Sequence, residues 1–304
     1  MPALTYFDKL FPPAALQARI AKAHPDKRGK GVLLGLTRPD EVGVFWRDEL
    51  DKWFEVGDRH RAIDADLEKR LQSGDWDQFI QAVNELQAAW FFEQKLGHTI
   101  SFRPAGAGRS VLEFSFVGPD GAEVFVEVKS PYDELPEDDV VLLDDEGKFR
   151  QSLKKAYKQI PKDGRRTLVV IAWEGFPVSG VADALLALYG REPSVTFRAA
   201  TREMTDPRHP ERFWHPGQNR SLCAVATLED GVINTRRSAI LDSVWETGKL
   251  PTQMPTPEFR YMLRAYHNPW CTSPPLDQRI FGDWPQFVPD DAAACMRWTS
   301  DPRD

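Results

Sequence analysis

Three features are scarce in this chain of 304 residues: cysteine, long apolar runs and excess positive charge. The three cysteines include no CxxC pair, which supports neither a disulfide framework nor a structural zinc site and fits a reducing cytoplasm. The longest apolar run, Leu168 to Trp173, is far shorter than the roughly 18 to 20 residues of a membrane span. The 39 basic and 46 acidic residues give a net charge of −7, which argues against a protein that coats DNA. We therefore expect a cytoplasmic protein with no membrane partner.

The first third of the chain has the periodicity of helices. Apolar residues recur at spacings of three and four between residues 13 and 96, which predicts about four helices. The longest is expected to begin at Asp75 or Asp77 and to end before Gly97, since these residue types favour helix N-caps and C-caps. After Gly97 the apolar residues alternate instead, which predicts three short strands, at residues 99–103, 111–117 and 123–130.

The rest of the chain continues the mixture of helices and strands. Helices are expected at residues 146–160, 178–189 and 236–247, with apolar strands at 167–173 and 221–228. Beyond residue 251 the chain is rich in Pro and Trp, with no clear period. The pattern predicts an α/β fold with a central mixed sheet flanked by helices. We divide it into an N-terminal helical segment (1–74), a core (75–230) and a C-terminal Pro/Trp-rich extension (231–304).

The segment Val124-Phe125-Val126-Glu127-Val128-Lys129 holds the most informative charges. Successive side chains of a strand point to opposite faces, so the three valines share one face while Glu127 and Lys129 share the other. An E-x-K tripeptide alone is no evidence of function, because about one is expected by chance in a chain of this length. Its context must therefore decide.

The preceding strand adds a second carboxylate, Glu113. If the two strands pair as a hairpin across Gly118 to Gly121, Glu113 and Glu127 can project from the same face. Two neighbouring carboxylates repel unless a cation lies between them. Mg²⁺ is bound by one or two carboxylates plus waters and phosphate oxygens, and Lys129 would add a point charge for a scissile phosphate.

A third carboxylate, Glu85, belongs to the long predicted helix. Its helical neighbours are small or apolar, namely Ala82, Ala88, Ala89 and Phe92. Burying a charge is costly, so Glu85 should have a partner. That partner could be a metal at the same site or a basic side chain such as Arg103, and the sequence leaves both open.

Taken in order, these pieces resemble the PD-(D/E)xK nuclease superfamily, the restriction-endonuclease-like fold. In that family a helix with a Glu precedes a three-stranded meander, whose second strand carries an acid and whose third carries (D/E)xK. A helix and another buried strand follow. Here Glu113 comes 28 residues after Glu85 and 14 before Glu127, over about residues 75–173. The family's second-strand acid is usually Asp after Pro, whereas this chain has Glu113 after Leu112.

The resemblance implies an Mg²⁺-dependent endonuclease, with Mn²⁺ as a substitute, that hydrolyses DNA. Glu113, Glu127 and the backbone carbonyl of Val128 would bind the metal, Glu85 would complete its shell, and Lys129 would position or activate the water. Polar residues on the following helix would line the site, and the candidates at helical spacing are Gln151, Lys155 and Gln159. A solvated helix face explains these last three equally well.

Charge is unevenly distributed around the predicted site. The segment 132–147 holds eight acids and no base, and residues 148–166 hold eight Lys or Arg. Phosphate contacts near the metal would fall on the basic stretch, and the acidic loop is expected to be solvated or to shield the site.

Two alternatives remain. The first is a binding or assembly protein that keeps the nuclease fold with a weakened or inactive site, favoured by Glu113 and the net charge. The second is a nuclease that acts on RNA, or one held as a homodimer or within a larger defence or repair complex.

Overall fold

The computed structural model describes residues 5–22, 36–39, 41–73, 75–106, 111–131, 145–174, 181–189, 196–198, 203–205, 213–214, 218–233, 258–289 and 296–299. The chain packs as two compact units, which we describe separately. The first comprises Met1–Trp90, Glu174–Phe176 and Glu229–Met262; the second comprises Phe91–Trp173, Pro177–Leu228 and Leu263–Asp304. The division into segments 1–74, 75–230 and 231–304 stays a prediction. The acidic loop and the helix expected at 236–247 lie outside the described residues.

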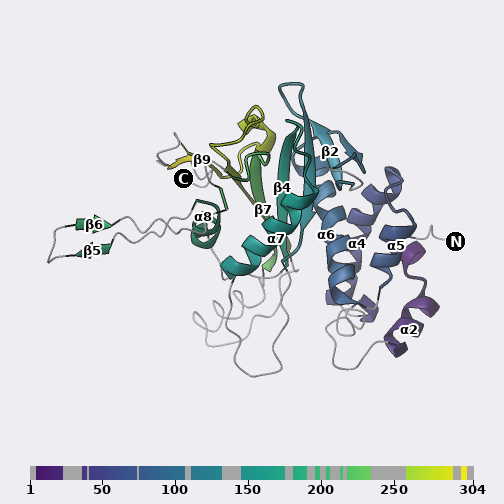
Figure 1. The fold of residues 1–304 in the computed structure, drawn as a ribbon. Coiled ribbons are helices and arrows are strands. Elements are labelled where there is room, and N and C mark those ends of the chain that lie inside the picture. The colour runs from purple at the N-terminus through teal and green to yellow at the C-terminus, as the bar shows by residue number, and fades with distance from the viewer. Residues whose placement is uncertain are drawn as a thin grey trace. The chain divides into compact units, whose positions relative to one another are not determined.

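The first unit is built from helices. They are α1 (Tyr6–Leu10), α2 (Pro13–Lys22), α4 (Glu41–Arg59), α5 (Ala65–Leu71) and α6 (Trp76–Trp90) (Figure 1). Helix α6 packs against α4 and α5, and α1 packs against α4. Phe7, Phe11 and Phe54 form a cluster with ring centroids 5.1 to 6.5 Å apart, which joins α1 to α4. The expected helical character of this part of the chain is confirmed.

The ends of the long helix follow local chemistry. The Asp75 carboxylate accepts hydrogen bonds from the backbone N–H groups of Asp77 and Gln78, so Asp75 is the N-cap. After Trp90 the helix continues as one π-helical turn, Phe91–Lys95. Gly97 then takes a φ of +74°, a conformation that favours glycine and ends the helix.

A mixed β-sheet organises the second unit, although its residues Glu174, Glu229–Ile233 and Glu258–Met262 are counted with the first. Its strands are β1 (Ile100–Phe102), β2 (Phe114–Val117), β3 (Glu123–Lys129), β4 (Arg166–Glu174), β7 (Ala224–Ile233), β8 (Glu258–His267), β9 (Gln286–Pro289) and β10 (Met296–Thr299), in the order β1-β2-β3-β4-β7-β8-β9-β10. The first three pair antiparallel, whereas β4 runs parallel to β3 and β9 runs parallel to β8. Strands β5 (Thr196–Arg198) and β6 (Glu203–Thr205) form a separate hairpin. The α/β class with a mixed sheet is therefore confirmed.

Helix α7 (Asp145–Gln159) makes the crossover between the parallel strands β3 and β4, as parallel pairing requires. Its apolar stripe and helix α8 (Val181–Tyr189) share one core with β4. This core includes Phe149, Leu153, Ala156, Ile160, Val169, Ile171, Ala187 and Leu188. A second aromatic group packs elsewhere on the sheet, where the Phe92 ring lies 5.6 Å from Phe114 and 5.4 Å from Phe116.

Two parts of the chain differ from expectation. Strand β2 begins at Phe114 rather than at residue 111, and the preceding Leu112 N–H donates to the Pro104 carbonyl, just after β1. The Pro/Trp-rich region, whose apolar residues show no clear periodicity, supplies β8, β9 and β10 to the sheet. Among the described residues, no helix is long and apolar enough to cross a membrane.

Candidate functional site

The predicted hairpin of β2 and β3 is confirmed. Phe114 pairs with Val126 and Phe116 with Val124 in antiparallel register. The connecting turn closes with a hydrogen bond from the Gly121 N–H to the Gly118 carbonyl, at 2.9 Å. Gly121 has a φ of +79°, which an L side chain rarely adopts. The turn thus fixes the register that places the predicted site residues.

Glu127 and Lys129 lie on the face of the sheet that α7 covers. In the parallel ladder, Glu127 pairs with Val169 and Lys129 with Ile171. Both of these β4 residues belong to the core formed with α7. Directly paired residues share a face, so the two charges project toward the α7 side while Val126 projects away from it.

The pair itself is desolvated. The Glu127 side chain is fully buried, and the Lys129 side chain is 16% exposed. The Lys129 ammonium forms an ion pair with Glu127 Oε1. Such a pair in a low-dielectric setting interacts more strongly than one at the surface, and neither charge can be removed without leaving the other uncompensated.

Glu113 is buried directly before β2 begins at Phe114. Its Oε2 accepts a hydrogen bond from the Val128 backbone N–H at 3.1 Å. The carboxylate therefore sits directly beside the E-x-K segment. The N–H and C=O of one strand residue point toward the same neighbouring strand, so the Val128 carbonyl also points to the Glu113 side. The structure brings together Glu113, Glu127, Val128 and Lys129 at one end of the hairpin.

Glu85 belongs to the first unit and has partners there. Arg70 donates from Nη1 to Glu85 Oε1 and from Nη2 to Oε2, both at 2.7 Å. Gln81 adds a third bond to Oε1 at 3.1 Å. This bidentate geometry is the strongest arrangement of a guanidinium with a carboxylate. The buried charge is thus balanced by Arg70 rather than by the Arg103 that the sequence offered.

The three predicted residues on α7 differ in exposure. Gln151 and Lys155 are exposed, and Gln159 is partly buried. The polar residues of α7 that are buried are instead Arg150, 8% exposed, and Ser152, 7% exposed. Sequence reasoning did not include Arg150 among the candidates, although it lies three residues before Leu153 in the apolar stripe. That spacing was the signal that could have identified it.

The donor set can be tested for its fit to Mg²⁺. Among the described residues, no group of three or more His, Cys, Asp or Glu side chains could hold a metal ion. Mg²⁺ often takes only one or two carboxylates from the protein, while water and phosphate supply its other ligands. The carboxylates of Glu113 and Glu127, with the Val128 carbonyl, match this small set of protein ligands. The site therefore fits a weakly held ion completed by substrate, and does not fit a closed protein cage.

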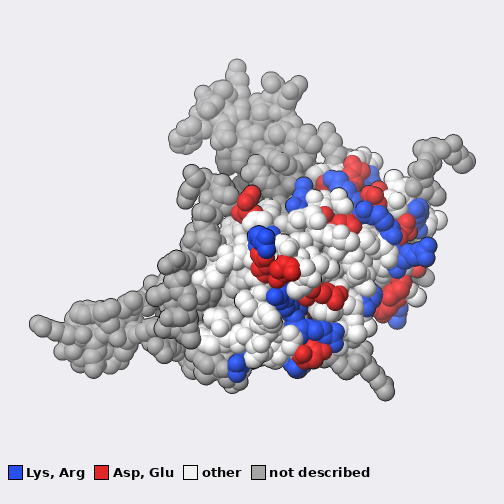
Figure 2. All heavy atoms as spheres, turned by 90° about the horizontal axis from the view of Figure 1, so that it is seen from above, with Lys and Arg blue, Asp and Glu red and all other residues white. Residues whose placement is uncertain are grey.

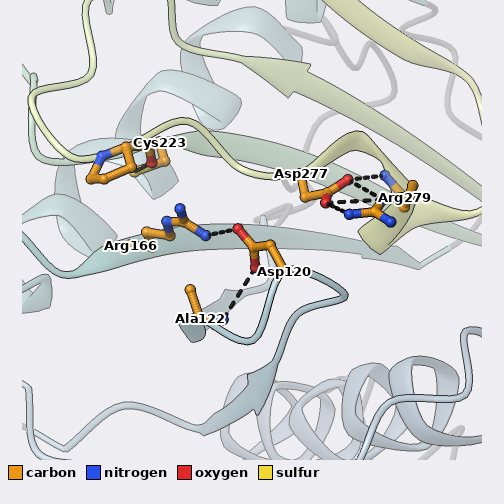
Figure 3. Close-up of polar contacts among 7 residues, drawn as sticks. Asp120, Ala122, Arg166, Cys223, Asp277 and Arg279 are labelled. Carbon is orange, nitrogen blue, oxygen red and sulfur yellow. Dashed lines mark hydrogen bonds and ion pairs between the residues drawn. The ribbon is translucent and has the colours of Figure 1, made fainter.

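The other end of β3 and β4 carries a second polar group (Figure 3). There Arg166 at the start of β4 points at Asp120 in the β2–β3 turn, and this hydrogen bond lowers the pKa of the Asp120 carboxyl. Nearby, Arg279 donates to Asp277 and lowers the pKa of that carboxyl. Arg166 pairs in register with Val124, five residues before Lys129, so this cluster is distinct from the candidate site.

Sequence reasoning also missed a pair of thiols. Cys223, just before β7, and Cys271, after β8, have Sγ atoms 2.7 Å apart. Their separation of 48 residues gave no motif that could have paired them.

Comparisons with known proteins add no assignment. No family model matches the chain, no curated protein matches it, and no solved structure matches it.

Proposed function

We propose that the chain is a Mg²⁺-dependent endonuclease that hydrolyses phosphodiester bonds of DNA, built on a restriction-endonuclease-like core. The observation that carries the proposal is the hydrogen bond from the Val128 N–H to Glu113 Oε2. It holds a second carboxylate beside the Glu127–Lys129 pair, although Glu113 comes from the segment before β2 and Glu127 from β3.

The order of elements gives further support. Helix α6, an antiparallel meander of β1, β2 and β3, the crossover helix α7 and the parallel strand β4 follow one another along the chain. This is the order described above for the PD-(D/E)xK family. The E-x-K lies in the third strand of the meander, and Glu113 lies one residue before the second strand begins.

Each residue has a chemical role in this proposal. Glu113, Glu127 and the Val128 carbonyl would hold Mg²⁺, which supplies positive charge to the leaving oxygen and lowers the pKa of a bound water. Lys129 holds its ammonium beside Glu127, where it can orient the attacking water and offset phosphate charge. The apolar side chains of β4 and α7 keep bulk water away from these charges and so strengthen the electrostatic interactions between them.

Substrate contacts would be local. The described face in Figure 2 carries Lys and Arg interspersed with Asp and Glu, without a broad patch of one sign. Exposed Lys154, Lys155 and Lys158 on α7 follow directly after the strand with the E-x-K and could contact phosphates flanking the cleaved bond. Binding should therefore weaken with salt, with a slope set by few contacts.

A cleavage assay tests the proposal. Plasmid, single-stranded DNA and RNA are incubated with the purified chain in Mg²⁺, in Mn²⁺ and in EDTA. We expect DNA cleavage that EDTA abolishes and that Lys129→Ala reduces at least about 100-fold. Lys69→Ala, which removes an exposed lysine from α5, is the matched control and should cut like the natural chain. DNA cleavage that is absent, or equal in Lys129→Ala, overturns the proposal.

One observation favours the alternative, a binding or assembly protein with an inactive site. The Glu85 carboxylate is engaged by Arg70 and Gln81, so in this arrangement it does not complete a metal shell. A chain that binds DNA in a gel-shift assay, with the same affinity in EDTA and in Mg²⁺ and without cutting it, would support this alternative.

A further inference from the structure

The cysteine pair lies at the end of the sheet opposite the candidate site. Cys223 comes directly before β7, and Cys271 follows the turn at the end of β8. Both are free thiols, and their Sγ atoms are 2.7 Å apart. A disulfide bond measures about 2.05 Å, so only a small approach separates the two sulfurs from bonding distance.

The backbone holds the two cysteines in place. The Asn268 N–H donates to the Cys223 carbonyl at 2.9 Å, and the Cys271 N–H donates to the Asn268 carbonyl at 3.2 Å. The Asn268 side chain also donates to the Leu222 carbonyl at 2.8 Å. On its other side, the Cys223 N–H donates to the Thr167 carbonyl in β4. Asn268 thus ties the backbones of both cysteines to one turn.

The two thiols are chemically unequal. Cys223 is 2% exposed, whereas Cys271 is partly exposed and lines a cavity of about 550 Å³ together with His267 and Asn268. The hydrogen bond between them lowers the pKa of the Cys271 thiol and raises that of Cys223, which burial raises further. The accessible thiol is therefore also the one that ionises first, and the thiolate is the reactive form.

We propose that Cys223 and Cys271 are a redox-active pair that closes reversibly to a disulfide when a hydroperoxide reaches the cavity. The Cys271 thiolate attacks the peroxide oxygen, the O–O bond breaks, and a sulfenic acid and hydroxide form. The Cys223 thiol then attacks the Cys271 sulfur, and water leaves as the S–S bond forms. Two electrons pass from the thiols to the peroxide, and a thiol reductant reverses the step.

The disulfide would crosslink two neighbouring strands of the sheet at one end. It would join the start of β7 to the turn after β8, in which Asn268 already supplies hydrogen bonds. The modification would be independent of nuclease activity, since Arg166 at this end pairs with Val124 while Lys129 pairs with Ile171. In a reducing compartment such a bond serves as a transient response to oxidant.

Thiol counting on the full chain tests the proposal. Reduced protein is treated with hydrogen peroxide, unfolded, and alkylated with N-ethylmaleimide before mass spectrometry. Without peroxide, all three cysteines should take the label. After peroxide, only one should, with a Cys223–Cys271 crosslinked peptide and a mass lower by about 2 Da before labelling. Dithiothreitol should restore three labels.

Variants separate this pair from other oxidation. Cys295→Ser should still form the crosslink, whereas Cys271→Ser should form none. A crosslink through Cys295, irreversible oxygen adducts on Cys271, or three labels after peroxide would each overturn the proposal. The peptide map of the natural chain needs no variant, so a variant that folds poorly does not spoil the test.

Discussion

At the scale of single residues, the ion pair of Arg70 and Glu85 compensates a charge that is buried in the first unit. Glu85 is 5% exposed and is held by two hydrogen bonds from one guanidinium. Arg70 also lies 3.3 Å from Asp66 within α5, and its bonds to Glu85 join α5 to α6. The pair is thus a structural joint within this unit.

Removing one partner should cost more than removing both. We expect Arg70→Met to lower the free energy of unfolding by about 3 kcal/mol, because it leaves the Glu85 carboxylate buried without its counter-charge. The double variant Arg70→Met with Glu85→Leu should recover most of this loss. Urea unfolding of the natural chain, of the single variants Arg70→Met and Glu85→Leu, and of the double variant measures the coupling. Equal losses that simply add would show that the pair contributes no interaction energy.

Glu113 offers a second residue-scale test, because its contribution to the stability of the chain can be separated from its proposed role as a metal ligand. Glu113→Gln keeps a side-chain oxygen that can accept from the Val128 N–H, so stability should change by less than about 1 kcal/mol. Glu113→Ala leaves that N–H without its carboxylate and should cost about 1 to 3 kcal/mol. Both should lose DNA cleavage. A Gln variant that cuts normally would remove Glu113 from the metal set.

At the scale of elements, Gly57 shows how closely the helices of the first unit approach. A Cβ built at Gly57 in α4 would lie 2.8 Å from Ile63 Cγ1 and 2.8 Å from Leu86 Cδ2 of α6. Leu86 is completely buried, so its methyl has little room to move. The absence of a side chain therefore lets α4 and α6 pack.

This contact predicts the sign of a helix substitution. Alanine is the better helix former by about 1 kcal/mol, yet overpacking costs about 1 to 3 kcal/mol. We expect Gly57→Ala to destabilise the chain by about 1 kcal/mol net, measured by thermal unfolding. Ala89→Gly, also in a buried helix position, gives the comparison in which propensity and packing both favour alanine. An increase in stability for Gly57→Ala would contradict the close approach.

At the scale of the whole molecule, two histidines link folding to pH. Burial lowers the pKa of His98 and His267 below the ordinary 6.5. His267 is bonded through Nε2 to the Gln286 side chain at 3.1 Å, and His98 Nε2 lies 2.8 Å from the Ile280 carbonyl. Both rings are neutral in the folded chain at pH 7.

Stability should therefore fall on acidification. Below pH 6.5 the unfolded chain binds protons that the folded chain refuses, so the free energy of unfolding decreases until the lower folded pKa is reached. His267 alone can contribute at most about 1.4 kcal/mol per pH unit. Urea midpoints at pH 7.5, 6.5 and 5.5 measure this. His267→Gln should reduce the change of unfolding free energy with pH. An unchanged slope in that variant would show that other groups cause the pH dependence.

Features that depend on local sequence could be predicted. Alternation around Val126 predicted β3, its faces and the shared side of Glu127 and Lys129, because a strand period is a local property. The Asp75 cap and Gly97 gave the ends of the long helix for the same reason.

Long-range partners could not be predicted. The Glu85 carboxylate pairs with Arg70 and not with the expected Arg103, because the packing between helices determines which basic side chain lies within reach. The thiols of Cys223 and Cys271 met through the adjacency of β7 and β8, a pairing that no spacing encodes. In the Pro/Trp-rich region, β8 pairs with β7 and β9, and β9 pairs with β10; the Pro-rich segment between β8 and β9 hid their alternation.

Strand β3 is buried on both faces, with valines on one and a charged pair on the other. A slip of one residue in its pairing would exchange these faces and push Glu127 into the valine layer, at the cost of an uncompensated charge. The residues proposed for chemistry therefore also penalise misfolded registers. A chain with apolar residues in place of both charges would lose this penalty, so the register of β3 would be less strongly specified.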